Sequence, residues 1–154
     1  MDVKQESAHL ILKLYELRRE EKLREARQWY FRDFNPETTK DLMMLMQNEQ
    51  HSAYFRMLTS YWDMAASLVN HGAIDAEMFT DANLEHLGVF AKVQPFVAEM
   101  RQTLNAPYYL AQLEKLVMSQ PDGTERVEQM RARQKQMAAM RQQAQAASAG
   151  EKAS

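Results

Sequence analysis

The longest amphipathic pattern in the chain predicts a helix over residues 50–71 that is buried on most of its circumference. At 100° per residue, the polar side chains of this segment share an arc about 100° wide. The remaining arc, about 220° wide, holds only apolar side chains, whereas a surface helix buries a narrower stripe. We therefore expect residues 50–71 to form the central helix of a bundle, ended by Gly72 in a left-handed conformation.

The segment before this helix shows two further helical patterns. Leucines at helical spacing predict one long helix over residues 5–34. Asn35 and Pro36 are expected to end it and to start the next helix, because proline fits the first helical position. The polar run of residues 47–50 predicts a bend or short break before the central helix.

The segment after the central helix predicts a long helix over residues 83–104 and a short one over residues 108–119. Pro95 lies inside the long helix. Proline has no backbone N–H, so it is expected to kink this helix and to free the carbonyl of Ala91 from its usual partner.

A strong stop at Pro121 and Gly123 predicts a domain boundary. We divide the chain into a helical domain (1–121), a C-terminal amphipathic helix (122–143) and a disordered tail (144–154). The apolar side chains of the C-terminal helix form an adaptable stripe, expected to bind a partner helix or to dock onto the domain. The stripe consists of Val127, Met130, Met137 and Met140.

The composition supports an all-α fold: a bundle of four to five main helices with a protruding C-terminal helix. The 154 residues include only 4 Gly and 4 Pro, and residues of high helix propensity are abundant. The chain has no Cys, which excludes disulfides, thiolate catalysis and Cys-ligated metal sites.

Charge is distributed unevenly along the chain. Residues 35–123 carry a net charge of −6 and residues 124–154 carry +3. The basic end has no aromatic side chain for stacking on bases, and the acidic middle would repel a phosphate backbone, so nucleic acid is not the expected partner.

A dense run of charges occupies residues 18–27, where eight of ten side chains are charged. Such a run is usually a solvated helix face. Binding of a partner through it is the less favoured alternative.

The sequence has no apolar run near the ~20 residues that span a bilayer and no secretory signal. We expect a soluble, cytoplasmic protein. Membrane association is expected only if an anchoring segment precedes this sequence.

The search for catalytic and metal-binding motifs finds no assembled set. There is no phosphate-binding glycine loop and no metalloprotease or hydrolase motif. The single Glu-x-x-His, Glu6 to His9, lacks the second copy that a helical di-iron site needs. We therefore expect no enzyme activity, no metal and no cofactor.

Asp63 is the one carboxylate within the most apolar helix. It belongs to the polar strip, so it is expected to be solvated or, if covered, to have a structural partner such as Arg56 or Arg101. The alternative is a ligand-binding role in a pocket near the Pro95 kink. The residues of that pocket would be Tyr61, Trp62, Asp63, Phe90 and Arg101.

The segment from Tyr61 to Asp75, followed by Phe79, Phe90, Pro95-Phe96 and Arg101, resembles a broad set of bacterial all-helical domains of unknown function. Those domains have a central helix ending in a Gly-x-Ile-Asp turn, and many follow an N-terminal transmembrane anchor, which this sequence lacks. The resemblance covers roughly residues 10–118. It implies the fold and no particular activity.

The function expected from these patterns is a non-enzymatic interaction or scaffold protein that associates with itself or with another helical protein. The alternative is a bundle that senses a small molecule in the pocket near Pro95. A third class, a helical enzyme using Asp63, Arg101 and His86, is the least favoured.

Overall fold

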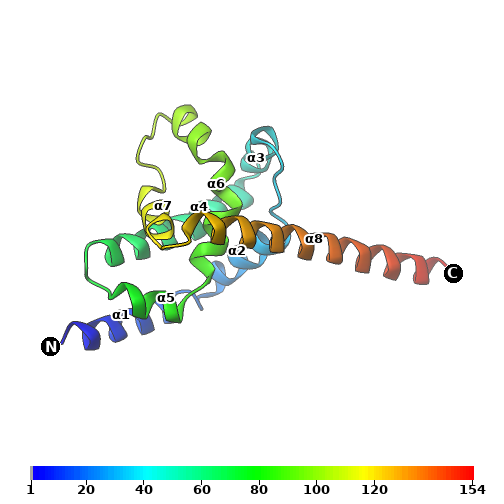
Figure 1. The fold of residues 1–154 in the computed structure, drawn as a ribbon. Helices are drawn as coiled ribbons and strands as arrows, with labels where there is room; N and C mark the ends of the chain where they lie inside the picture. Colours follow the sequence, from blue (N-terminus) through cyan, green and yellow to red (C-terminus); the bar gives the residue numbers. More distant parts are fainter. Residues whose placement is uncertain (1) are drawn as a thin grey trace.

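The computed structural model describes residues 2–154, which form eight α-helices and no strand (Figure 1). Over these residues the fold is therefore all-α, as the composition predicts. The helices are α1 (Val3–Leu17), α2 (Glu21–Arg32), α3 (Thr39–Met46), α4 (Glu49–Asn70), α5 (Ala76–Ala82), α6 (Glu85–Thr103), α7 (Ala111–Met118) and α8 (Gly123–Ala153).

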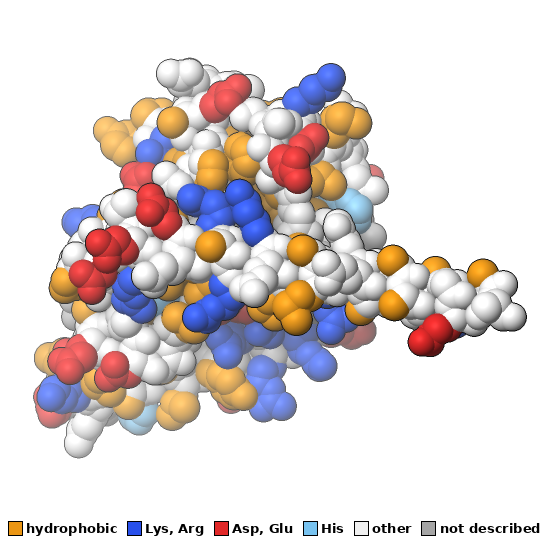
Figure 2. Space-filling view, turned by 45° about the vertical axis from the view of Figure 1, so that its right-hand side comes forward, with side chains coloured by type: hydrophobic (Ala, Val, Ile, Leu, Met, Phe, Trp, Pro, Cys, Tyr) orange, Lys and Arg blue, Asp and Glu red, His pale blue; other side chains and the backbone are white. Residues whose placement is uncertain are grey.

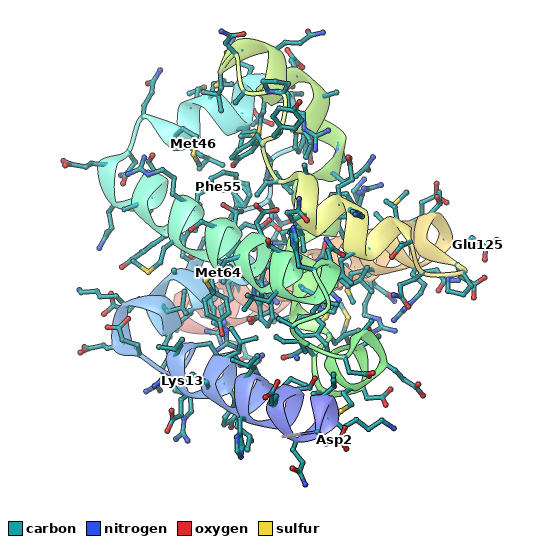
Figure 3. The ribbon with its side chains drawn as sticks, turned by 90° about the vertical axis from the view of Figure 1, so that its left-hand side faces the viewer. Asp2, Lys13, Met46, Phe55, Met64 and Glu125 are labelled. Carbon is teal, nitrogen blue, oxygen red and sulfur yellow. The ribbon has the colours of Figure 1, made fainter. Side chains whose placement is uncertain are left out.

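Helix α4 is the centre of the domain, as its wide apolar arc predicts. It contacts α2, α3, α5, α6 and α7, and Figure 3 shows it crossing the molecule between α1 and α7. Phe55 and Trp62 are among its buried side chains. Two residues depart from the pattern: Met64 is 46% exposed, whereas Thr59 is buried and donates to the carbonyl of Phe55 over 2.7 Å.

The predicted helix over residues 5–34 is in fact two helices. Residues 18–20 separate α1 from α2, and the carboxylate of Glu20 accepts from the backbone N–H of Leu23 over 3.0 Å as the N-cap of α2. The hydroxyl of Tyr61 on α4 donates to the carbonyl of Leu14 near the end of α1. Local propensity favours an unbroken helix here, so contacts with α4 decide the break.

The next helix also starts later than predicted. Thr38, not Asn35, caps α3, in a capping box with Asp41, which satisfies two backbone N–H groups at once. The predicted break before the central helix is confirmed, since Asn48 caps α4 and accepts from the N–H of His51 over 3.0 Å.

The carbonyl that Pro95 frees is used to dock α8. Arg131 on α8 donates from Nε to the carbonyl of Ala91 over 3.0 Å. Gln134, one turn further along α8, donates to the carbonyl of Gly88 over 2.9 Å. The backbone acceptors of α6 therefore anchor the first half of α8 against the domain.

Helix α8 continues to Ala153, through residues 144–153, which were expected to be disordered. Alanine is the best helix former, and the segment is rich in it, which explains why the local helix continues. Its first half lies on α6 and α7, while its second half projects from the domain (Figure 1). The C-terminal helix is thus protruding, but only over its second half.

Candidate functional site

Asp63 has a structural partner. Its Oδ1 accepts from the backbone N–H of Leu113 over 2.9 Å. Leu113 lies in the first turn of α7, whose N-cap, Leu110, has a φ of 54° and provides no side-chain hydrogen bond. Asp63 therefore supplies from α4 the capping oxygen that α7 lacks in its own sequence.

Arg101 holds the segment that leads into the same helix. Its Nε donates to the carbonyl of Tyr109 over 2.9 Å, and both terminal nitrogens lie 3.3 Å from Oε1 of Glu114. Asp63 and Arg101 thus fix neighbouring parts of α7 and of the turn before it. Burial raises the pKa of the Tyr109 hydroxyl in this segment to about 12.

The other three residues of the predicted pocket belong to the core. Trp62 and Phe90 are fully buried, and the hydroxyl of Tyr61 binds the carbonyl of Leu14. With Asp63 and Arg101 holding α7, all five residues have packing or capping contacts. A ligand pocket formed by these residues stays a prediction.

Replacing Asp63 with alanine is expected to lower the free energy of unfolding by about 1–2 kcal/mol, because the partly buried hydrogen bond that caps α7 is lost. Asp63→Asn keeps an acceptor oxygen and should lose less. Urea unfolding of both variants tests this, with Asp81→Ala as an exposed control that should stay within about 0.5 kcal/mol of the parent. An unchanged midpoint for Asp63→Ala would contradict the capping role.

The structure shows a partly buried charge cluster that the sequence analysis missed. Glu85, whose side chain is only 10% exposed, receives a hydrogen bond from Arg27 Nε on one oxygen and from Trp62 Nε1, at 3.0 Å, on the other. Arg18 lies 4.0 Å from the second oxygen. The cluster joins α2, α4, α6 and the link after α1 through residues far apart in the sequence, which explains why no local pattern indicates it.

His86, the next residue of α6, is buried against the rings of Phe79 and Trp62, with centroids 5.1 and 6.0 Å away. Its Nδ1 has no hydrogen-bond partner among residues 2–154. Burial, with a smaller contribution from nearby Arg126, lowers the pKa of His86 to about 4. The ring is therefore neutral near pH 7.

Lys92 closes the C-terminal end of α2. Its Nζ donates to the carbonyls of Tyr30 and Phe34, both over 2.7 Å. These carbonyls have no partner from a continuing helix, so the lysine satisfies them. Burial, reinforced by Arg141, lowers the pKa of Lys92 to about 8.

The four residues of the predicted stripe on α8 divide into two pairs. Val127 is buried and Met130 packs against the core, so both dock α8 onto its own domain. Met137 and Met140 are 49% and 60% exposed. The sequence left two alternatives open for these residues, docking onto the domain and binding a partner. Val127 and Met130 dock onto the domain.

Three surface hollows lie beside α8. A basic groove of about 810 Å³ runs along α2, and an apolar crevice of about 250 Å³ lies between α2, α6 and α8. The third, about 700 Å³, lies beside Pro95 and includes Lys92 and Arg131 in its wall. A hollow does exist near Pro95, but the five predicted pocket residues are not part of its wall.

Among residues 2–154, no helix is long and apolar enough to cross a membrane. In the same part of the chain, no three His, Cys, Asp or Glu side chains are grouped closely enough to hold a metal ion.

Comparison with known proteins gives one result. No curated protein and no solved structure matches the chain. The model of one protein family matches residues 5–119, which include most of α1, all of α2 to α7 and the contacts of Asp63, Arg101 and Glu85 described above. The chain therefore belongs to the family described as "Domain of unknown function (DUF4760)".

Proposed function

We propose that this protein is a non-enzymatic helical interaction domain that associates with a second copy of itself through the projecting half of α8. The observation that carries the proposal is that α8 continues well beyond the last hydrogen bond that it forms with the domain, from Arg141 to the carbonyl of Phe31. From residue 142 to the end of the chain every residue is exposed.

A projecting helix of this length needs a partner for stability. Isolated helices shorter than about 12–15 residues are marginal in water, because most helical stability comes from packing. One apolar strip runs from the last docked turns of α8 into its projecting half, and its members fall within an arc about 80° wide. The strip consists of Met137, Met140, Ala144 and Ala147.

A second copy is the favoured occupant of this strip. Small alanines allow two helices to approach closely, and methionine adapts to the surface opposite. Twofold pairing lets the same strip serve both subunits, and this is the commonest symmetry of soluble oligomers. The net charge of the projecting segment is small, so little repulsion opposes the pairing.

Three polar residues of the domain have structural contacts, and this supports the non-enzymatic part of the proposal. Asp63 caps α7, Arg101 holds the turn before it, and Glu85 is bound by Arg27 and Trp62. A catalytic group needs a position from which it reaches a substrate. The sensing alternative has less support, because its five residues have structural contacts.

Sedimentation equilibrium of the full chain tests the proposal. We expect the parent protein to be dimeric at micromolar concentrations. Met140→Glu should raise the dimer dissociation constant about tenfold or more. The change removes an apolar side chain that pairing would bury, and it introduces a charge. Ala146→Glu adds the same charge on the opposite face of α8 and should leave the dimer intact.

Two results would contradict the proposal. A parent protein that stays strictly monomeric at high micromolar concentration excludes self-association. Equal weakening by Met140→Glu and Ala146→Glu would show that added charge, and not the apolar strip, controls the assembly.

A further inference from the structure

The basic groove and the apolar crevice beside α8 meet at two residues. Phe31 on α2 and Arg141 on α8 contribute to the walls of both. Figure 2 shows Lys and Arg side chains gathered along one side of α8, with hydrophobic side chains among them. The two hollows therefore form one continuous surface, apolar at one end and basic at the other.

The crevice is mostly hydrocarbon. Its exposed lining is predominantly apolar, with Met130 and Met137 on one side and the ring of Phe31 on the other. Gly88 forms part of the α6 wall, where an added Cβ would lie 3.2 Å from the Phe31 ring. The absence of a side chain at this position lets Phe31 lie close against α6.

The groove is strongly basic. Five arginines contribute to it, against two glutamates: Arg19, Arg24, Arg27, Arg32 and Arg141, with Glu21 and Glu25.

Two of these arginines already have partners. Arg27 is paired with Glu85, and Arg141 donates to the carbonyl of Phe31. Over residues 2–154 the remaining three, Arg19, Arg24 and Arg32, form no ion pair. Arg19 lies over the ring of Tyr15, and the three guanidinium groups give the groove beside the apolar crevice an excess of positive charge.

We propose that this surface binds a small amphiphile with a single alkyl chain and an anionic head group, a carboxylate or a phosphate. The chain lies in the crevice between Phe31 and Met137, and the head group lies among the arginines of the groove. Guanidinium groups bind both oxyanions through paired N–H donors. This proposal goes beyond self-association, because it uses the surface between α8, α2 and α6, although Met137 borders both this surface and the strip proposed for pairing.

The volumes decide between one alkyl chain and two. Pockets that enclose small ligands usually measure about 300–1,000 Å³, so the crevice, at about 250 Å³, suits a single short chain. The wider groove has room for a hydrated head group. A free single-chain amphiphile is therefore favoured over a diacyl lipid in a membrane.

Titration of full-length protein carrying ¹³C-labelled methionine methyl groups tests the proposal by NMR. The ligands are octanoate, decanoate and dodecanoate below their micelle concentrations. We expect saturable shifts of the Met130 and Met137 methyl signals and none of Met64, which lies on α4 on the side of the molecule turned to the viewer in Figure 3. Binding should tighten about fourfold per added methylene until the crevice is full.

Matched ligands and variants separate the two parts of the surface. Dodecyltrimethylammonium should bind about tenfold more weakly than dodecanoate, because its head group cannot pair with arginine. Arg24→Gln combined with Arg32→Gln should weaken dodecanoate binding about tenfold, while Lys152→Gln, on the projecting end of α8, should not. Repeating the titration with Met140→Glu separates ligand binding from self-association.

Four results would overturn the proposal. Equal affinities for dodecyltrimethylammonium and dodecanoate would show that the arginines do not contribute to binding. Equal affinities for inorganic phosphate and dodecanoate would show that the crevice does not contribute. An absence of methyl shifts up to millimolar ligand would exclude the site. Binding to anionic phospholipid vesicles without binding of free dodecanoate would assign the surface to a membrane.

Discussion

Replacing Glu85 with glutamine is expected to lower the free energy of unfolding by about 2 kcal/mol, because removing one member of a partly buried ion pair leaves the arginine charge without its partner. Glu85 is 10% exposed, and Arg27 is 31% exposed. Glutamine has the same shape as glutamate and can still accept a hydrogen bond from Trp62 Nε1. The lost stability therefore measures mainly the contribution of the charge. Denaturant unfolding followed by circular dichroism gives the value.

The control for Glu85 is Glu114, which pairs with Arg101 but is 40% exposed. Exposed ion pairs contribute little, so Glu114→Gln should cost less than about 1 kcal/mol. A double-mutant cycle of Glu85→Gln with Arg27→Gln should give a coupling of about 0.5–3 kcal/mol. Equal losses at the two glutamates, or zero coupling to Arg27, would show that the cluster does not act as one unit.

The second large effect is a loss of stability in mild acid that depends on His86. Its pKa is about 4 in the folded protein and about 6.5 in an unfolded chain. Between these values the unfolded chain binds more protons, so the free energy of unfolding falls as the pH is lowered through this window. This contribution is restored in full above about pH 6.5.

From pH 7 to pH 5, the parent protein should lose about 2 kcal/mol more stability than the variant His86→Leu. His71→Gln serves as the control, because His71 is exposed, and it should follow the parent. Urea unfolding at both pH values measures the difference. Identical pH dependence in parent and His86→Leu would contradict the buried, neutral state of this ring.

Local sequence was sufficient for the features that depend on a few neighbouring residues. The wide apolar arc of residues 50–71 correctly predicted α4 as the central helix. Pro95 predicted a free carbonyl at Ala91, because the missing N–H is a property of proline itself. The structure adds only the identity of its partner, Arg131.

The candidate sites were harder to predict. The sequence analysis allowed a structural partner for Asp63, and that alternative is correct. However, it suggested an arginine where the partner is the backbone N–H of Leu113. Backbone groups are the same at every residue, so no pattern of side chains can indicate which one a distant carboxylate will reach.

The sequence by itself determined the helical class, the central helix and the stop at residues 121–123, because propensity, periodicity and Pro–Gly punctuation act within a few residues. Only the tertiary structure decided that α1 and α2 are separate, that Glu85 joins four parts of the chain, and that arginines 19, 24 and 32 meet an apolar crevice beside α8. The physical reason is that these features depend on groups brought together by packing. Their energies come from burial and charge pairing across helices, which local propensity does not contain.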